Sequence, residues 1–139
     1  MSTLEKLARQ IFDSQPFSGH LGASLESVGT DSAEIALTIT DELTQQHGFA
    51  HGGVLSYLAD NSMAFAGGLA LGGDVLMSEF KINFVRPAVG GRVVARARTT
   101  AVSRRQAVCQ SKVFAVSDDG GETLCAVAQG TVVAASTEK

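Results

Sequence analysis

The sequence has little of several residue types that mark particular classes of protein. Its 139 residues include no tryptophan, one tyrosine, two prolines and two cysteines. Cys109 and Cys125 are too few for a disulfide framework and match no zinc-binding spacing, so we expect a reducing compartment and no metal site. The formal net charge is only −3, which argues against a partner made of nucleic acid.

A long hydrophobic run and a secretory leader are also lacking. The most apolar stretch, 54–71, is interrupted by Asp60, Asn61 and paired glycines, whereas a membrane-spanning helix needs about 20 consecutive apolar residues. The first ten residues contain no apolar leader core. We therefore expect a cytoplasmic protein without a membrane segment.

The chain does contain enough apolar sequence for a packed core. Hydrophobic residues make up 45% and charged residues 18%, a balance that favours a folded domain over disorder. No repeat or linker divides the chain, so we expect residues 1–139 to form a single domain.

Hydrophobic spacing predicts two helices. Residues 3–12 carry apolar side chains at helical intervals, with Ser2 or Thr3 as the N-cap, and we expect Pro16 and Gly19 to break the chain after them. Residues 52–71 are apolar almost all round and are followed by a glycine pair. That pattern is typical of a long buried helix.

The remaining segments alternate between apolar and polar residues, as strands do. We expect two strands within 22–40, and four after the long helix, over about 78–84, 92–103, 105–116 and 122–134. Because the connections between these segments are short, the strands form an antiparallel sheet. The predicted fold class is α+β, with a curved sheet wrapped around one long central helix.

Two neighbouring features indicate chemistry. His51-Gly52-Gly53 lies where a loop becomes the buried helix, and a helix N-terminus presents free N–H groups that can polarise a carbonyl oxygen. Asp60 lies in the middle of the apolar helix, where a carboxylate is costly unless it is paired or functional. Structural roles are the alternatives: close packing for the glycines, a loop-fixing ring for His51, and for Asp60 a satisfied polar pair with Asn61 at an oligomer interface.

Two longer runs carry a resemblance to a known family. HGFAHGGVLSYLADN at 47–61 and SEFKINFVRPAVGG at 78–91 resemble the hotdog-fold acyl-CoA thioesterases of the phenylacetate-pathway (PaaI-like) type. The resemblance implies a hotdog fold, hydrolysis of an acyl-CoA thioester to free acid and CoA, and no cofactor. It also implies a homodimer, with two such dimers forming a homotetramer.

The resemblance assigns roles to individual positions. Asp60 activates water as a general base or attacks the thioester as a nucleophile, and the Gly52 N–H polarises the carbonyl. Gln45, or its neighbour Gln46, adds a side-chain amide. Ser78 helps to hold the water, and strand alternation independently predicts that its side chain points toward the central helix.

The other candidates surround this group. His51 stands with the catalytic residues and Gly53 with the substrate-binding ones. Because coenzyme A carries several phosphates and the chain is net acidic, local basic residues must receive it. The candidates are Arg86, Arg104 and Arg105, whereas Arg92, Arg96 and Arg98 fit an exposed strand face. The pocket for an aryl-acetyl or medium-chain acyl group could be lined by Phe49, Tyr57, Leu58 and Phe65, and each of these could equally belong to the core.

Helix geometry predicts that one chain cannot hold the whole site. Gly52 and Asp60 are eight residues apart, which is about 12 Å along a helix, and a reacting carbon must lie about 3 Å from both groups. We therefore expect two antiparallel helices across a twofold axis to pair Gly52 of one chain with Asp60 of the other.

Two further functions stay open beside hydrolysis. One is an acyl-thioester hydratase or dehydratase of the same fold, which would use a histidine with a differently placed carboxylate. The other is a non-catalytic acyl-CoA-binding module. A pure binder, however, has no need of a carboxylate that faces the helix terminus of its partner.

Overall fold

The helix predicted over 52–71 is present with those bounds. This computed structural model describes residues 2–135. In it, α3 (Gly52–Leu71) is followed by Gly72, which has a left-handed conformation with φ of 75°. Its inward side chains are buried, among them Leu58 and Met63 at 0% exposure. No helix within the described residues is long and apolar enough to span a membrane.

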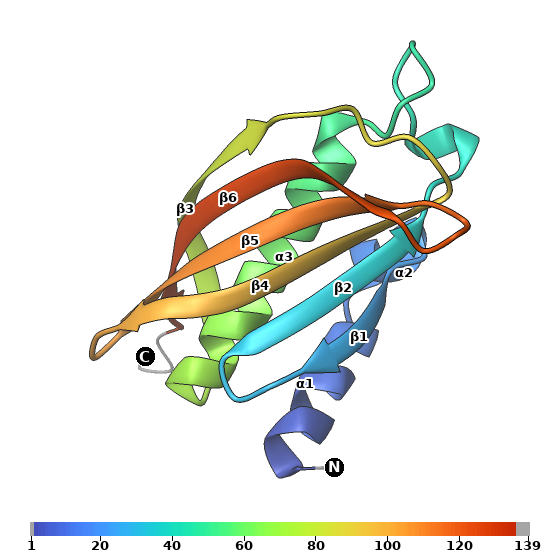
Figure 1. The fold of residues 1–139 in the computed structure, drawn as a ribbon. Coiled ribbons are helices and arrows are strands. Elements are labelled where there is room, and N and C mark those ends of the chain that lie inside the picture. Colours follow the sequence, from blue (N-terminus) through green and yellow to red (C-terminus); the bar gives the residue numbers. More distant parts are fainter. Residues whose placement is uncertain (1, 136–139) are drawn as a thin grey trace.

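A six-stranded antiparallel sheet curves around α3 (Figure 1). Its spatial order is β1-β2-β4-β5-β6-β3. The predicted α+β hotdog architecture is therefore confirmed. The strands are β1 (Ser24–Val28), β2 (Ser32–Thr38), β3 (Val75–Phe84), β4 (Arg92–Val102), β5 (Gln106–Val116) and β6 (Glu122–Ala134).

Alternation along the strands separates a core face from an outer face. On β4, Val93, Ala95 and Ala97 are buried on the core face, while Arg92, Arg96 and Arg98 lie on the opposite, outer face, as predicted. There Arg92 pairs with Glu26 at 2.6 Å, and Arg96 pairs with Glu122 at 2.6 Å and with Glu34. Arg92 and Arg96 are neutralised within the chain.

Two short helices precede the sheet. α1 (Thr3–Asp13) is confirmed, with the Ser2 side chain accepting the Glu5 N–H as N-cap. The predicted break at Pro16 and Gly19 is wrong, because α2 (Pro16–Leu21) begins at that proline and includes that glycine. A proline at the first helical position has the correct φ and loses no hydrogen bond that the helix needs. A single 3₁₀ turn, η1 (Asp41–Leu43), follows β2.

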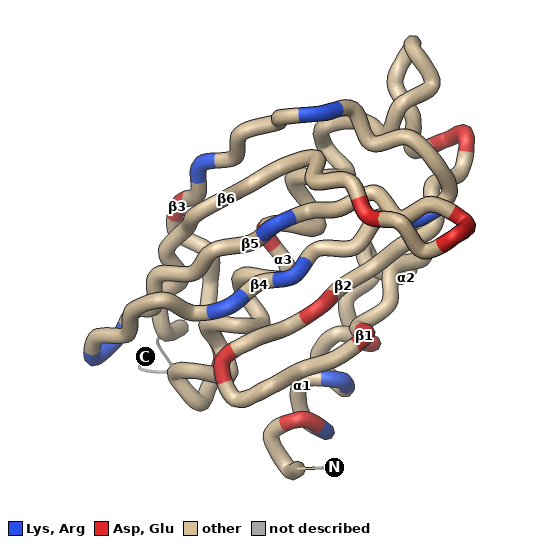
Figure 2. The backbone as a smooth tube through the Cα atoms, in the orientation of Figure 1, with Lys and Arg blue, Asp and Glu red and all other residues tan. Residues whose placement is uncertain are grey.

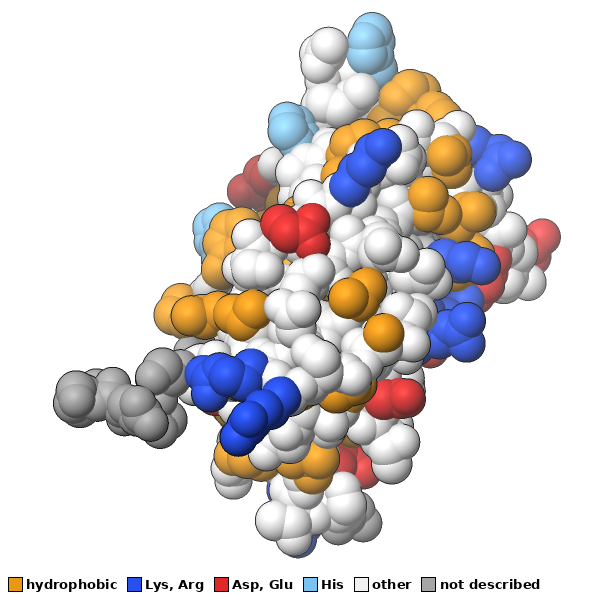
Figure 3. Space-filling model, turned by 90° about the vertical axis from the view of Figure 1, so that its left-hand side faces the viewer, with side chains coloured by type: hydrophobic (Ala, Val, Ile, Leu, Met, Phe, Trp, Pro, Cys, Tyr) orange, Lys and Arg blue, Asp and Glu red, His pale blue; other side chains and the backbone are white. Residues whose placement is uncertain are grey.

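The two edges of the sheet differ. β1 is five residues long, and Arg9 from α1 donates a hydrogen bond to its Leu25 carbonyl at 2.8 Å. β3 is ten residues long and lies at the opposite edge, where Leu76 and Phe84 are 65% and 53% exposed. Figure 3 looks toward this side of the molecule and shows hydrophobic side chains in several patches. Long apolar edges of this kind tend to pair with another chain.

β3 also contains an irregularity that corrects one expectation. Its register with β6 shifts between Met77 and Glu79, so Ser78 is the extra residue of a β-bulge. The alternation that predicts Ser78 on the same inward face as Phe80 is therefore wrong. Ser78 is exposed, and its hydroxyl donates to the Thr131 carbonyl at 2.9 Å.

Candidate active site

The N-terminus of α3 is organised by its capping histidine. The Nδ1 atom of His51 accepts the Gly53 N–H at 2.8 Å, and the His51 carbonyl accepts the Val54 N–H at 2.9 Å. No residue within 2–135 accepts a hydrogen bond from the Gly52 N–H. Of the three amides that open the helix, Gly52 alone is thus left to bind a ligand, and the helix dipole favours negative charge there.

The absence of side chains at the two glycines keeps this amide accessible. A Cβ atom at Gly53 would lie 3.1 Å from Nδ1 of His51, so a side chain there would press on the cap. A Cβ atom at Gly52 would lie 3.4 Å from the ring of Phe84. Phe84 ends β3 and is 53% exposed, so its ring forms one wall beside the free amide.

Asp60 lies about two turns further along α3 and is half-buried. Burial raises the pKa of its carboxyl above the ordinary value of 3.8. No group between residues 2 and 135 donates a hydrogen bond to this carboxylate. A carboxylate that is partly desolvated and unpaired is a stronger base than one in water. The neighbouring Asn61 donates to Gln15 at 2.9 Å and not to this carboxylate.

The helix confirms the separation of Gly52 and Asp60. Both belong to one uninterrupted α-helix, so about 12 Å of axial rise lies between them. The structure therefore does not bring the two groups to one point within a chain. Both residues are half-buried in the single chain.

Gln45 organises the loop that precedes α3. Its side-chain oxygen accepts the backbone N–H groups of His47 at 2.7 Å and Phe49 at 3.2 Å, and an isolated bridge joins Thr44 to Ala50. The loop projects beyond the sheet in Figure 1. With its oxygen engaged, Gln45 retains the Nε2 amide as a donor, while Gln46 is exposed at the tip.

The candidate phosphate contacts lie at opposite ends of the sheet. Arg86 follows β3 at the end where α3 begins, and donates to the Leu124 carbonyl at 3.0 Å. Arg104 and Arg105 occupy the β4–β5 turn at the end where α3 stops, and Arg105 is next to the end of β6. Figure 2 shows basic residues at both places. One chain therefore does not gather the three arginines.

A polar network that the sequence did not reveal joins α2 to α3. The Ser18 hydroxyl, 1% exposed, lies 2.6 Å from the Tyr57 hydroxyl and donates to Oε1 of Gln15 at 2.7 Å. Asn61 donates to the same Gln15 oxygen at 2.9 Å. Tyr57 and Asn61 are four residues apart on α3, so the spacing was visible, but nothing in the sequence identified α2 as their partner.

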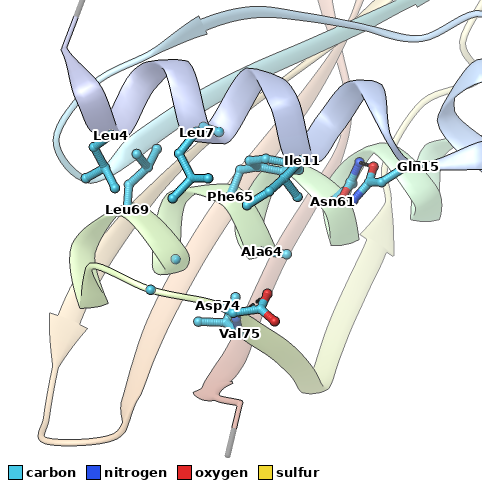
Figure 4. A pocket seen from close by; sticks show the side chains of 13 residues that line it. Leu4, Leu7, Ile11, Gln15, Asn61, Ala64, Phe65, Leu69, Asp74 and Val75 are labelled. Carbon is cyan, nitrogen blue, oxygen red and sulfur yellow. Dashed lines mark hydrogen bonds between the residues drawn. The ribbon is translucent and has the colours of Figure 1, made fainter. Parts of the chain in front are cut away.

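The structure places the four candidate acyl-pocket residues in different surroundings. Leu58 is fully buried and belongs to the core, which was one of the two roles expected for it. Phe65 lines a groove of about 420 Å³ between α1 and the C-terminal half of α3 (Figure 4). Tyr57 is half-buried and packs edge-on against Phe17, with ring centroids 5.5 Å apart. Phe49 lies in the loop before α3, beside His47.

Comparison with known proteins agrees with this geometry. Residues 47–125 match the Thioesterase superfamily. A thioesterase family protein from Silicibacter pomeroyi has 32% sequence identity and a TM-score of 0.88 over 94% of this chain and 96% of its own. A candidate esterase from Haemophilus influenzae is 33% identical over 66% of this chain and 67% of its own.

A third protein has the same fold at lower identity. The E. coli PaaI protein from the phenylacetic acid degradation operon has a TM-score of 0.84 and 22% identity, over 96% of this chain and 94% of that one. The residues that match the Thioesterase superfamily, 47–125, include the His51-Gly52-Gly53 turn, Asp60 and the strand with Ser78. The chain thus belongs to the thioesterase superfamily, and its resemblance to the PaaI-like hotdog thioesterases is confirmed.

Proposed function

We propose that this protein hydrolyses acyl-CoA thioesters at a site shared by two copies of the chain. The observation that carries the proposal is the free Gly52 N–H, which opens a 20-residue helix that also bears the unpaired Asp60 carboxylate. An N–H donor of this kind stabilises the negative charge that develops on a thioester oxygen. The thioesterase superfamily supports the reaction class.

The proposed reaction divides the work between the two groups. The Gly52 N–H of one copy donates to the thioester carbonyl oxygen, and Asp60 of the other copy removes a proton from water as the water oxygen attacks the carbonyl carbon. Collapse of the tetrahedral intermediate breaks the C–S bond and releases the CoA thiolate, which takes up the proton. Direct attack by Asp60 would give an anhydride instead, which water then opens.

A homodimer is part of the proposal because neither copy holds a complete site. The exposed apolar edge of β3 supports such an assembly, since a second β3 could extend the sheet there. An antiparallel twofold arrangement would place two equivalent sites across the interface. Two dimers would then form the proposed homotetramer in the cytoplasm. CoA phosphates would meet Arg86 near the Gly52 end, or Arg104 and Arg105 at the other.

The test is thiol release from a panel of acyl-CoAs, including phenylacetyl, hydroxybenzoyl, and short, medium and long straight chains. Asp60→Asn should lower turnover by about a hundredfold or more, whereas Asp118→Asn, in an exposed hairpin turn, should not. Turnover that does not depend on Asp60 would contradict the mechanism. A folded oligomer without turnover on any thioester would favour the binding-module alternative.

A further inference from the structure

The groove between α1 and α3 is apolar along most of its length. Leu7 and Ile11 point from α1 toward α3, above Ala64 and Phe65 (Figure 4). Leu7 is 47% and Ile11 39% exposed, so two large apolar side chains face an open space instead of a packed one. The volume of about 420 Å³ is within the range of about 300–1,000 Å³ that small-molecule pockets occupy.

The groove begins next to the candidate carboxylate: Asn61 lines it, and Asp60 does not. Asp60, Ala64 and Gly68 are each four residues apart on α3, so they form one line along the helix surface. Ala64 and Gly68 line the groove, and Asp60 lies one turn, about 6 Å, before Ala64. Both of these lining residues are small, so along this line α3 places no long side chain between the carboxylate and the groove.

The two ends of the groove differ in chemistry. At the end near Asp60, Gln15 and Asn61 hydrogen-bond to each other at 2.9 Å, and the Tyr57 and Ser18 hydroxyls occupy their neighbouring positions. At the far end stands Asp74, an exposed carboxylate. The walls of the groove are apolar between these two ends. The Gln15–Asn61 pair at one end is already hydrogen-bonded and Asp74 at the other is negative, so the groove suits an uncharged hydrocarbon chain.

We infer that this groove holds the acyl chain of the thioester that is attacked beside Asp60 of the same copy. The inference rests on the proposed function, because it takes the carbonyl to lie at Asp60. From Asp60 to Gly68 the helix rises about 12 Å, which a straight chain of about eight to ten carbons spans with C–C bonds of about 1.5 Å. The substrate class is a medium straight-chain acyl-CoA with an uncharged chain end.

The test fills the groove from the α1 side. In the wild-type protein kcat/KM should rise about threefold to fourfold for each added methylene up to decanoyl-CoA. Leu7→Trp should reduce the ratio of decanoyl-CoA to acetyl-CoA turnover at least tenfold, and Ile11→Trp serves as a second variant. Gln10→Trp is the matched control, because Gln10 is exposed on the same helix and does not line the groove. Its ratio should stay at the wild-type value.

Binding measured without hydrolysis separates the outcomes. Decanoyl-CoA titrated into Asp60→Asn by calorimetry should bind at least tenfold more weakly when Leu7→Trp is added. Normal hydrolysis with a chain-length profile that Leu7→Trp leaves unchanged would overturn the acyl groove and keep the proposed function. No turnover on any acyl-CoA, with decanoyl-CoA binding unchanged by Leu7→Trp, would overturn both. A change of oligomeric state in Leu7→Trp would assign the groove to a second copy of the chain instead.

Discussion

The Nδ1 atom of His51 lies 2.8 Å from the backbone nitrogen of Gly53, and this hydrogen bond decides which amide of α3 is free. Had the ring bonded to Gly52, the amide nearest the loop would have been consumed by the protein itself. The cap instead holds the second glycine and leaves the first exposed to a ligand. His51 thereby supports the candidate oxyanion site without needing to transfer a proton.

Removal of this cap should affect both stability and turnover. His51→Ala should lower the free energy of unfolding by about 1 kcal/mol, the usual cost of losing a side-chain N-cap, and should reduce thiol release because Gly52 loses its fixed orientation. His51→Asn supplies another capping oxygen and should restore both quantities. Denaturant unfolding and thiol release check the pair. If His51→Asn is stable yet as inactive as His51→Ala, the ring has a chemical role beyond capping.

The Gly52 amide can be deleted with little change to the backbone. Gly52 is the first helical residue and His51 before it is extended, at φ −62° and ψ 140°, so a proline fits this position. Gly52→Pro should lower kcat by about 10²–10³, the usual effect of losing one oxyanion donor. Gly52→Ala keeps the N–H and is the control for the added bulk near Phe84. Equal losses in both variants would point to steric blockage.

Mixing two inactive variants tests the shared site. Gly52→Pro and Asp60→Asn chains, unfolded and refolded together in equal amounts, should give about a quarter of wild-type activity. Half of the randomly formed dimers are mixed, and each of these has one intact site of two. Each variant refolded alone is the control. Mixed dimers that are demonstrated by mass spectrometry but remain inactive would exclude a site built from both copies.

The raised pKa of Asp60 predicts two opposite pH effects. Activity requires the ionised carboxylate, so kcat/KM should fall on acidification with a midpoint above the ordinary Asp value of 3.8. Stability runs the other way. Because the native pKa is higher than the unfolded one, the contribution of Asp60 is present below the unfolded pKa and is lost as pH rises through the native pKa.

Comparison with the amide isolates the stability effect. Asp60→Asn should therefore have a higher Tm than wild type near neutral pH, and the difference should shrink as pH falls toward the unfolded pKa. Thermal unfolding at several pH values measures it. A Tm difference that is constant with pH would mean that titration of Asp60 does not contribute.

Two helical glycines should respond to alanine with opposite signs. A Cβ atom at Gly67 in α3 would collide with Val132 and lie 3.1 Å from the sulfur of Cys109, so Gly67→Ala should destabilise the protein by about 1–3 kcal/mol. Gly19 in α2 has open space at the same position, and Gly19→Ala should stabilise it by about 0.5–1 kcal/mol. Chemical denaturation compares the two. Stabilisation by Gly67→Ala would mean that Val132 in β6 can move aside without a loss of stability.

Local pattern was sufficient where burial and secondary structure share one period. The bounds of α3 follow from an apolar run between His51 and Gly72, and the strands follow from alternation of two residues. Pattern failed where one residue shifts the register. The bulge at Ser78 depends on how β3 meets β6, and Gly130 closely faces Phe80 there, which a single strand cannot reveal.

The candidate site shows the same division. The free Gly52 amide and the desolvated Asp60 were recoverable because both belong to one helix with known rise. The groove is not predictable in this way, because its walls come from two separate helices, α1, which ends at Asp13, and α3, which begins at Gly52. The helix α2, which Ser18 joins to α3, begins at Pro16, where the sequence predicts a break. A feature that is formed by two segments far apart in the chain can be predicted only when the positions of both segments in space are known.

The unequal edges of the sheet limit how far the sheet can grow by pairing of its edge strands. A sheet with two open borders could add copies without end, as fibrils do. Here Arg9 donates to a carbonyl of the short β1, so the ten-residue β3 is the longer edge at which another strand could be added. Pairing through β3 stops after one partner, because both β3 strands of the pair are then used. The β3 edge that would complete the proposed site in the dimer would then also prevent further polymerisation through the sheet.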